Sequence, residues 1–150
     1  MILGVAIALT ACSSPRSDSQ ALVLNLMQQR ECLDCDLSNL NLPDTDLSGV
    51  KLNRSKLAGA NLKGANLKGA LLDSVDLTGA DLSGAVLTDV TLADANLTNA
   101  NLSGATMTGA FLSGAILEGT NLSNVDLDGA DLSATDLGKA NTKGANLPKK

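Results

Sequence analysis

A leucine recurs at every fifth residue over most of the chain, and this period constrains the fold more than any other feature. Between positions 37 and 147 there are 23 such positions, and 21 of them hold leucine; the exceptions are Met107 and Thr142. In an α-helix, five residues turn the chain by about 500°, so these leucines would scatter around the axis. In a flat strand, an odd period would place successive leucines on opposite faces. The period therefore predicts a chain that turns a corner in every repeat.

The residues beside each leucine predict which side chains face the core. The residue two positions before the leucine is alanine at 13 of the 23 positions and is otherwise small or short at nearly all of them. Residues two apart in an extended segment point to the same side, so both columns face inward. The second residue after the leucine is glycine at 12 positions, which fits the left-handed position of a type II turn. Asp, Arg, Ser, Ala or Lys fills other corners, where we expect a different turn type.

The repeats "GANLK", "GADLS" and "NANLS" resemble the A(D/N)LXX pattern of the pentapeptide repeat family, and the match covers residues 35–149. The resemblance implies an all-β fold, a right-handed quadrilateral β-helix with four repeats per coil. The repeats would then make about six coils, and the rod would be about 27 Å long at ~4.8 Å per coil. The first repeats, "CDLSNLNL", are similar to those of cyanobacterial members of the family.

The first residues differ in composition from the repeats. Residues 1–12, "MILGVAIALTAC", are apolar and resemble a bacterial lipoprotein signal, in which small residues precede a cysteine that receives lipid, here Cys12. Residues 13–20 have the composition of a flexible linker. This reading predicts a protein anchored to a membrane in the cell envelope. The alternative is an apolar tail without a targeting role, because no Lys or Arg precedes the apolar run; the protein would then be cytoplasmic.

Both ends of a solenoid must be covered. Residues 21–34 have apolar residues at helical spacing, and we expect a short capping α-helix there, with Asp18 or Ser19 as N-cap. Residues 35–149 would form the β-helix. The last coil has Thr142 in the leucine column and no helix after it in this sequence. It either frays or packs against a second copy, which would give a homodimer.

Two cysteines, Cys32 and Cys35, form the motif "CLDC". In an exported protein, a structural disulfide is the first expectation. Free thiols are the second, since Cys35 also falls in the small inward column. A redox or zinc site is the third, although the chain has no histidine and no second cysteine pair to complete a zinc site. We therefore expect no metal and no cofactor.

Residues twenty apart should stack if four repeats form each coil. One outward column would then be an amide ladder, made of Asn41, Asn61, Asp81, Asn101, Asn121 and Asn141. Apolar residues replace the usual polar ones at Leu71, Val86, Phe111 and Ile116. We interpret these four as a partner patch around the central coils; the alternative is scattered surface residues.

Charge and composition bound the function. Ten acidic residues and no Lys or Arg lie between residues 73 and 136, whereas basic residues gather at 51–68 and 139–150. The net charge of −5 argues against nucleic-acid binding. The first hypothesis is a non-enzymatic, lipid-anchored structural or protein-interaction module with a protein partner not identified by the sequence. The second, from the family resemblance, is a cytoplasmic DNA mimic that modulates DNA gyrase. An enzyme using Asp126 and Asp128 is disfavoured, because no pocket is expected around them.

Overall fold

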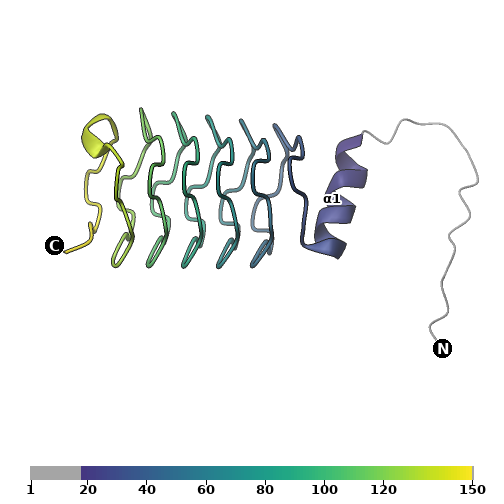
Figure 1. Ribbon diagram of the computed structural model, residues 1–150, viewed down its shortest axis with the longest axis horizontal. Helices are drawn as coiled ribbons and strands as arrows, with labels where there is room; N and C mark the ends of the chain where they lie inside the picture. Colours follow the sequence, from purple (N-terminus) through teal and green to yellow (C-terminus); the bar gives the residue numbers. More distant parts are fainter. Residues whose placement is uncertain (1–17, 150) are drawn as a thin grey trace, which may run out of the picture.

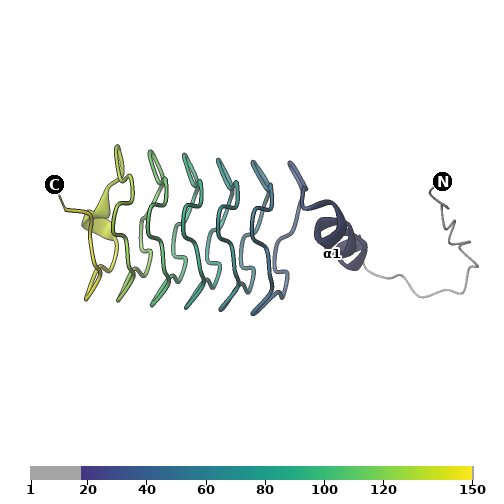
Figure 2. The same cartoon turned by 90° about the horizontal axis from the view of Figure 1, so that it is seen from below.

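The computed structural model describes residues 18–149, which form a rod of stacked coils (Figure 1). Helix α1 (Asp18–Gln29) lies at one end of the rod and the C-terminus at the other, as two perpendicular views show (Figures 1 and 2). The predicted signal segment, its Cys12 and residues 13–17 of the linker lie outside the described residues. Within residues 18–149, no helix is both long and apolar enough to cross a membrane.

Successive coils are joined by parallel β-bridges between residues twenty apart, such as Asn41 with Asn61 and Asn61 with Asp81. Four pentapeptides therefore make one coil, as the family resemblance implied. The described residues contain these isolated bridges but no longer strand. The physical reason is that each side of the coil contributes one bridged residue before the chain turns.

Each coil has four sides, and we number them in chain order by the outward residues that the bridges connect. Side 1 carries Glu31, Lys51, Leu71, Thr91, Phe111 and Asp131. Side 2 carries Asp36, Lys56, Asp76, Asn96 and Ile116. Side 3 carries Asn41, Asn61, Asp81, Asn101, Asn121 and Asn141. Side 4 carries Asp46, Asn66, Val86, Thr106, Asp126 and Asn146.

Tight turns form the corners between the sides. Val50 donates its backbone N–H to the carbonyl of Leu47 at 3.2 Å, and the same bond recurs in most repeats. The second corner residue has a positive φ, as predicted for glycine. The expectation of a different turn is wrong at the Asp, Arg, Ser and Ala corners, where for example Arg54 (φ 61°) and Ala134 (φ 57°) adopt the same conformation, but Lys139 does depart from it. Bonds between coils, such as Arg54 N–H to Asp73 O at 3.0 Å, hold the backbone there.

The core is the pair of inward columns that the sequence predicted. Leu92 and Ala95 are fully buried, and Met107 replaces leucine without becoming exposed. Two polar residues, Ser55 and Thr120, are also buried in the small column. Each donates its hydroxyl to a carbonyl of the preceding coil at 2.7 Å, so neither leaves a buried polar group without a partner.

The first coil begins earlier than predicted. We expected a helix over 21–34 and repeats from 35, but α1 ends at Gln29 and Glu31 already bridges to Lys51. Arg30 ends the helix with a φ of 55° while its N–H bonds to Leu26 O at 2.9 Å. Leu33, which contributed to the helical pattern, instead lies exposed in the first corner.

The last coil departs from the regular repeat. A short 3-10 helix, η1 (Leu137–Lys139), protrudes from it (Figure 1). Asp136 accepts the N–H of Gly138 at 2.8 Å and caps this turn. In "DLGK", glycine stands one position before the corner and Lys139 occupies the corner itself. The unbroken register expected for the whole rod is therefore wrong on side 2 of the last coil.

Candidate functional site

The outward residues of side 3 form the predicted ladder. The Asn61 amide donates to Asn41 Oδ1 at 2.6 Å, and the Asn101 amide donates to Asp81 Oδ1 at 3.2 Å. From Asn61 onward, the side-chain Oδ1 of each ladder residue also accepts the backbone N–H of the residue two positions later, as Asn61 does from Lys63 at 3.2 Å. The side chain of Asp81 has no N–H to donate to Asn61, so the ladder is interrupted between them. Side 3 is thus largely hydrogen-bonded to itself.

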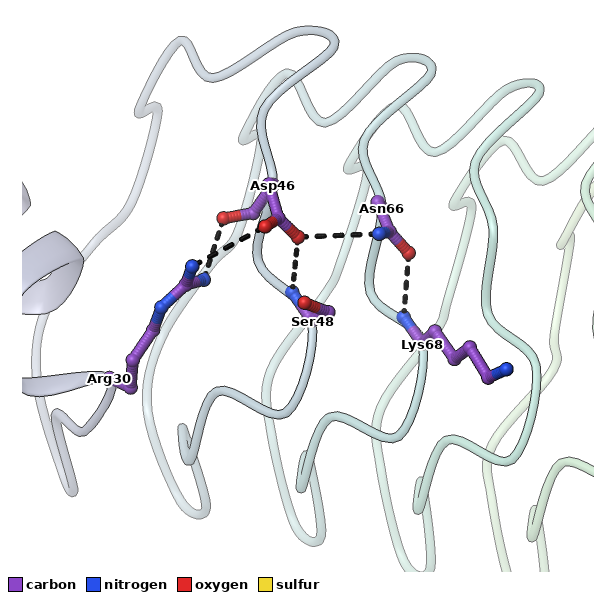
Figure 3. A network of polar contacts seen from close by, with 5 residues as sticks. All are labelled: Arg30, Asp46, Ser48, Asn66 and Lys68. Atoms are coloured by element: carbon purple, nitrogen blue, oxygen red, sulfur yellow. Dashed lines mark hydrogen bonds and ion pairs between the residues drawn. The ribbon is translucent and has the colours of Figure 1, made fainter.

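A polar network joins the end of α1 to side 4 (Figure 3). The Arg30 guanidinium donates to the backbone carbonyl of Asp46 at 2.8 Å and to its carboxylate at 3.4 Å. The same carboxylate accepts from the Asn66 amide at 3.3 Å and from Ser48 N–H at 3.1 Å. Hydrogen bonds from Ser48, aided by Arg30, hold the pKa of Asp46 below its usual range. The network fixes the first two coils to the helix end.

Cys32 and Cys35 are joined by a disulfide in the first coil, with Cα atoms 5.7 Å apart. Cys32 occupies the leucine column and is buried. The hydroxyl of Ser55 donates to Cys32 O at 2.7 Å and accepts the N–H of Cys35 at 3.1 Å, which fixes the loop between them. Across the part of the chain that the structure describes, no group of three or more His, Cys, Asp or Glu residues is arranged to hold a metal ion.

The four apolar residues of the predicted partner patch lie on three sides of the coil. Leu71 is half-buried and Phe111 is 51% exposed, both on side 1. Val86 (38% exposed) lies on side 4 and Ile116 (51%) on side 2. Sides 2 and 4 face opposite directions, so the structure does not join Val86 and Ile116. It brings together Phe111 and Ile116, which flank one corner of one coil.

Asp126 and Asp128 lie near one another on side 4, but their surroundings do not favour acid–base chemistry. The Asp126 carboxylate accepts the Asn146 amide at 2.8 Å and the N–H of Asp128 at 3.2 Å. These bonds, the Asn146 amide first, hold the pKa of Asp126 below its usual range. A carboxyl group that acts as a general acid needs a raised pKa. The bonds of Asp126 therefore suit a carboxylate that holds neighbouring coils together.

Sequence reasoning missed two hollows at the last coil. A groove of about 250 Å³ opens where η1 protrudes, lined by Gly114, Ala115, Ile116, Leu117, Glu118, Ala134, Asp136 and Lys139. A hollow of about 320 Å³ at the end of the rod is lined by Ala130, Leu132, Leu137, Leu147, Pro148 and Lys149. The sequence "DLGK" indicated the groove, because its glycine stands one position before the corner where the regular repeat has it.

Comparisons with known proteins agree with the repeat geometry. A sequence model of pentapeptide repeats (8 copies) matches overlapping ranges at 31–69, 51–89, 70–109, 86–124 and 95–133. No curated protein matches the sequence. A pentapeptide repeat protein of the Arabidopsis thaliana thylakoid lumen is 33% identical over 67% of this chain and 70% of its own, with a TM-score of 0.65. One from the cyanobacterium Cyanothece 51142 is 30% identical over 87% of this chain and 95% of its own, with a TM-score of 0.54. The chain therefore belongs to the pentapeptide repeat family, whose fold is a right-handed, four-sided β-helix.

Proposed function

We propose that this protein is a non-enzymatic interaction module, in which a rigid rod presents side chains to a protein partner. The observation that carries the proposal is the position of Phe111. It is the chain's single aromatic residue, yet the fold leaves it 51% exposed beside the equally exposed Ile116. Burying a phenylalanine contributes about 1.5–3 kcal/mol, and aromatic residues are enriched at interfaces. A partner that covers this corner would supply that burial.

Paired variants test this proposal. Leu71→Asp combined with Phe111→Asp removes the apolar character of side 1, while Val86→Asp makes the same change on side 4. We expect the first variant to lose a partner captured by crosslinking in cells and the second to retain it. Thermal melting should show both variants folded, because the substituted positions face outward. Retention of the partner by the folded double variant would contradict the proposal.

We further propose that the protein is exported and anchored through lipid on Cys12. The motif "LTAC" supports this, as does the Cys32–Cys35 disulfide, because disulfides persist in oxidising compartments. The similar Arabidopsis protein comes from the thylakoid lumen. Mass analysis of the purified N-terminal peptide, with cell fractionation, tests the proposal. A soluble protein with an unmodified Cys12 would contradict it.

The two ends of the rod fit different roles. Leu26 of α1 is buried in the core cluster, and Leu22, Val23 and Met27 pack against it, which supports α1 as the cap of the first coil.

At the C-terminal end of the rod, Leu147 is 40% exposed beside the 320 Å³ hollow. We propose that a second copy covers this end. Leu147→Lys should then convert a dimer to a monomer in sedimentation, and a wild-type monomer at high concentration would exclude the dimer.

The second candidate is a DNA-mimic modulator of gyrase. The observation that favours it is the run from residue 73 to residue 136, which holds ten acidic and no basic residues. The basic residues at 51–68 and 139–150 flank this run and prevent a continuous negative field along the rod, which makes this candidate the weaker one. A gyrase supercoiling assay with the purified protein decides it: a dose-dependent change in supercoiling supports the candidate, and unchanged supercoiling excludes it.

A further inference from the structure

One position in the β-bridge pattern has lost its partner. At the last coil, Phe111 bridges to Asp131, Asn121 to Asn141 and Asp126 to Asn146. Ile116 on side 2 would bridge to Asp136 by the same rule, but within residues 18–149 it forms no bridge toward the last coil. The chain from residue 134 to 139 passes outward through η1 instead.

The missing bridge leaves two backbone groups unpaired. In the regular pattern one coil earlier, Leu97 donates its N–H to Ile116 O at 2.9 Å, and Ile116 donates its N–H to Ala95 O at 2.9 Å. The equivalent groups facing the last coil are the N–H of Leu117 and the carbonyl of Ala115. Neither forms a hydrogen bond with any residue that the structure describes. Backbone groups that lose water without a partner are costly, so this donor and acceptor form an open β-edge.

The open edge forms one wall of the 250 Å³ groove. Backbone of residues 114–118 lies on one side, and Ala134, Asp136 and Lys139 lie on the other. The neighbouring bond also slips by one residue, because Gly119 donates to Lys139 O at 3.0 Å, whereas the regular twenty-residue stacking would use residue 138. The groove is therefore bounded by a regular bond at one end, from Gly114 N–H to Ser133 O at 3.0 Å, and by this shifted bond at the other.

The backbone leaves the regular path at the corner beside the groove. The corner position of each regular repeat has a positive φ, even at Arg54 and Ala134, whereas Lys139, which occupies that position here with Gly138 directly before it, does not. Asp136 accepts the N–H of Gly138 at 2.8 Å and caps η1.

We propose that an extended peptide of a protein partner binds in this groove by β-augmentation and completes the missing bridge. One residue of the peptide donates its N–H to Ala115 O and accepts the N–H of Leu117, as main-chain pairing does in other edge complexes. Its apolar side chain packs on Ile116 and extends toward Phe111 around the corner. The inference rests on the proposed function, because it specifies the partner of the same interaction module.

The charges beside the groove specify the peptide further. Glu118 and Lys139 form an ion pair at 3.2 Å, which leaves Asp136 as the excess charge of the lining. Asp94 lies at the adjoining corner, next to Gly114. Asp131 lies beside Phe111 on side 1. The surroundings are negative, so the complementary peptide carries lysine or arginine next to its apolar residue.

A peptide titration tests the inference directly. The probe is an acetylated, amidated peptide of sequence TKVKT, whose central apolar residue is flanked by lysines, added to the ¹⁵N-labelled full chain. We expect a saturable shift of the Leu117 amide resonance, while the Leu97 amide, which is already bonded, stays in place. A peptide N-methylated at its central residue cannot donate to Ala115, and should bind about tenfold more weakly or worse. No saturable shift, or equal binding of both peptides, would overturn the inference.

A composition-preserving variant supplies the matched control. Exchanging Gly138→Lys and Lys139→Gly moves glycine to the corner and restores the regular repeat. We expect the Leu117 amide to exchange with solvent as slowly as that of Leu97 in this variant, and peptide binding to fall about tenfold or more. Undiminished binding with a protected Leu117 amide would overturn the proposal. Partner loss in the Leu71 and Phe111 double variant is measured separately, so failure of the groove and failure of the interaction module are distinguishable.

Discussion

Substituting corner glycines tests how neighbouring coils are held in register. Gly64 and Gly69 occupy successive corners of one coil, with φ of +66° and +63°. An alanine Cβ at position 64 would overlap the carboxylate oxygen of Asp44 and lie 3.3 Å from its Cγ, whereas one at position 69 would meet nothing within 4 Å. Asp44 occupies the same corner one coil earlier. The two substitutions thus share the backbone strain and differ in the contact with the carboxylate.

The expected magnitudes follow from these two terms. A non-glycine residue in the left-handed region costs about 1–2 kcal/mol, which applies to both variants. Forcing the Asp44 side chain from its rotamer adds about 0.5–1.5 kcal/mol. We therefore expect the free energy of unfolding to fall by about 1–2 kcal/mol for Gly69→Ala and by about 1.5–3.5 kcal/mol for Gly64→Ala. In an Asp44→Gly background, the additional loss of stability caused by Gly64→Ala relative to Gly69→Ala should disappear.

Urea denaturation of the variants, alone and with Asp44→Gly, measures this coupling as a double-mutant cycle. In a solenoid, stability can vary from coil to coil along the rod. Both glycines lie in one coil, so this variation does not affect their comparison. Equal losses for Gly64→Ala and Gly69→Ala would refute the reasoning. An excess at position 64 that persists without the Asp44 carboxylate would refute it as well.

The same arrangement recurs along the rod. Six Asn or Asp residues with positive φ each precede, by twenty residues, a glycine whose added Cβ would meet their side-chain oxygen. The pairs are Asn39 with Gly59, Asp44 with Gly64, Asp89 with Gly109, Asp94 with Gly114, Asn99 with Gly119 and Asn124 with Gly144. At another such corner Asp34 meets Arg54 and forms an ion pair with it at 2.8 Å. Corner residues in neighbouring coils are thus matched to one another.

Three further outcomes are expected. Leu92→Asp should abolish the folded rod in circular dichroism, because it buries a carboxylate without a partner. Leu92→Met, which imitates Met107, should lower the free energy of unfolding by less than about 1.5 kcal/mol. A Leu92→Asp variant with unchanged melting temperature would show that the core assignment is wrong. Ser55→Ala should lower the free energy of unfolding by about 1–3 kcal/mol, since two backbone groups of the disulfide loop lose their partner, and an unchanged urea midpoint would contradict that role. Hydrogen bonds from Ser48 to Asp46 and from Ser133 to Asp131 hold both carboxyl pKa values below their usual range, so their stabilisation is present above about pH 4 and lost as the pH falls through the folded-state pKa. Asp46→Asn with Asp131→Asn keeps the acceptor oxygens and should flatten the loss of melting temperature below about pH 4; an unaltered acid dependence would exclude these two carboxyls as its source.

Much of the fold followed from the sequence because each repeat is short and local. The five-residue period placed Leu92 and Ala95 inward, and the glycine column predicted the positive φ at the corners. The twenty-residue stacking predicted the hydrogen bonds of the side 3 ladder. Each of these inferences depends on side chains within one repeat or on one constant offset between repeats. A single wrong residue therefore changes little in the prediction.

The errors arose where neighbouring coils or segments decide the conformation. Leu33 suited a helical pattern, but pairing between Glu31 and Lys51 drew that segment into the first coil. Arg54 has no intrinsic preference for a left-handed corner, and the hydrogen bond that its backbone N–H donates to Asp73 O of the next coil holds it there. Val86 and Ile116 lie on sides 4 and 2, which flank side 1 and face opposite directions, so the sequence could not show which of them shares a corner with Phe111.

The sequence by itself determined the repeat and the core columns, because a period of five with inward leucine and alanine permits few other arrangements; the number of sides was implied by the family resemblance. The tertiary structure alone decided which exposed residues share a corner and where the pairing between coils fails. Phe111 and Ile116 flank one corner because the chain turns at Ser113 and Gly114. The edge at Leu117 is open because the chain leaves the last coil through η1, and this loss of pairing appears only when one coil is placed against the next.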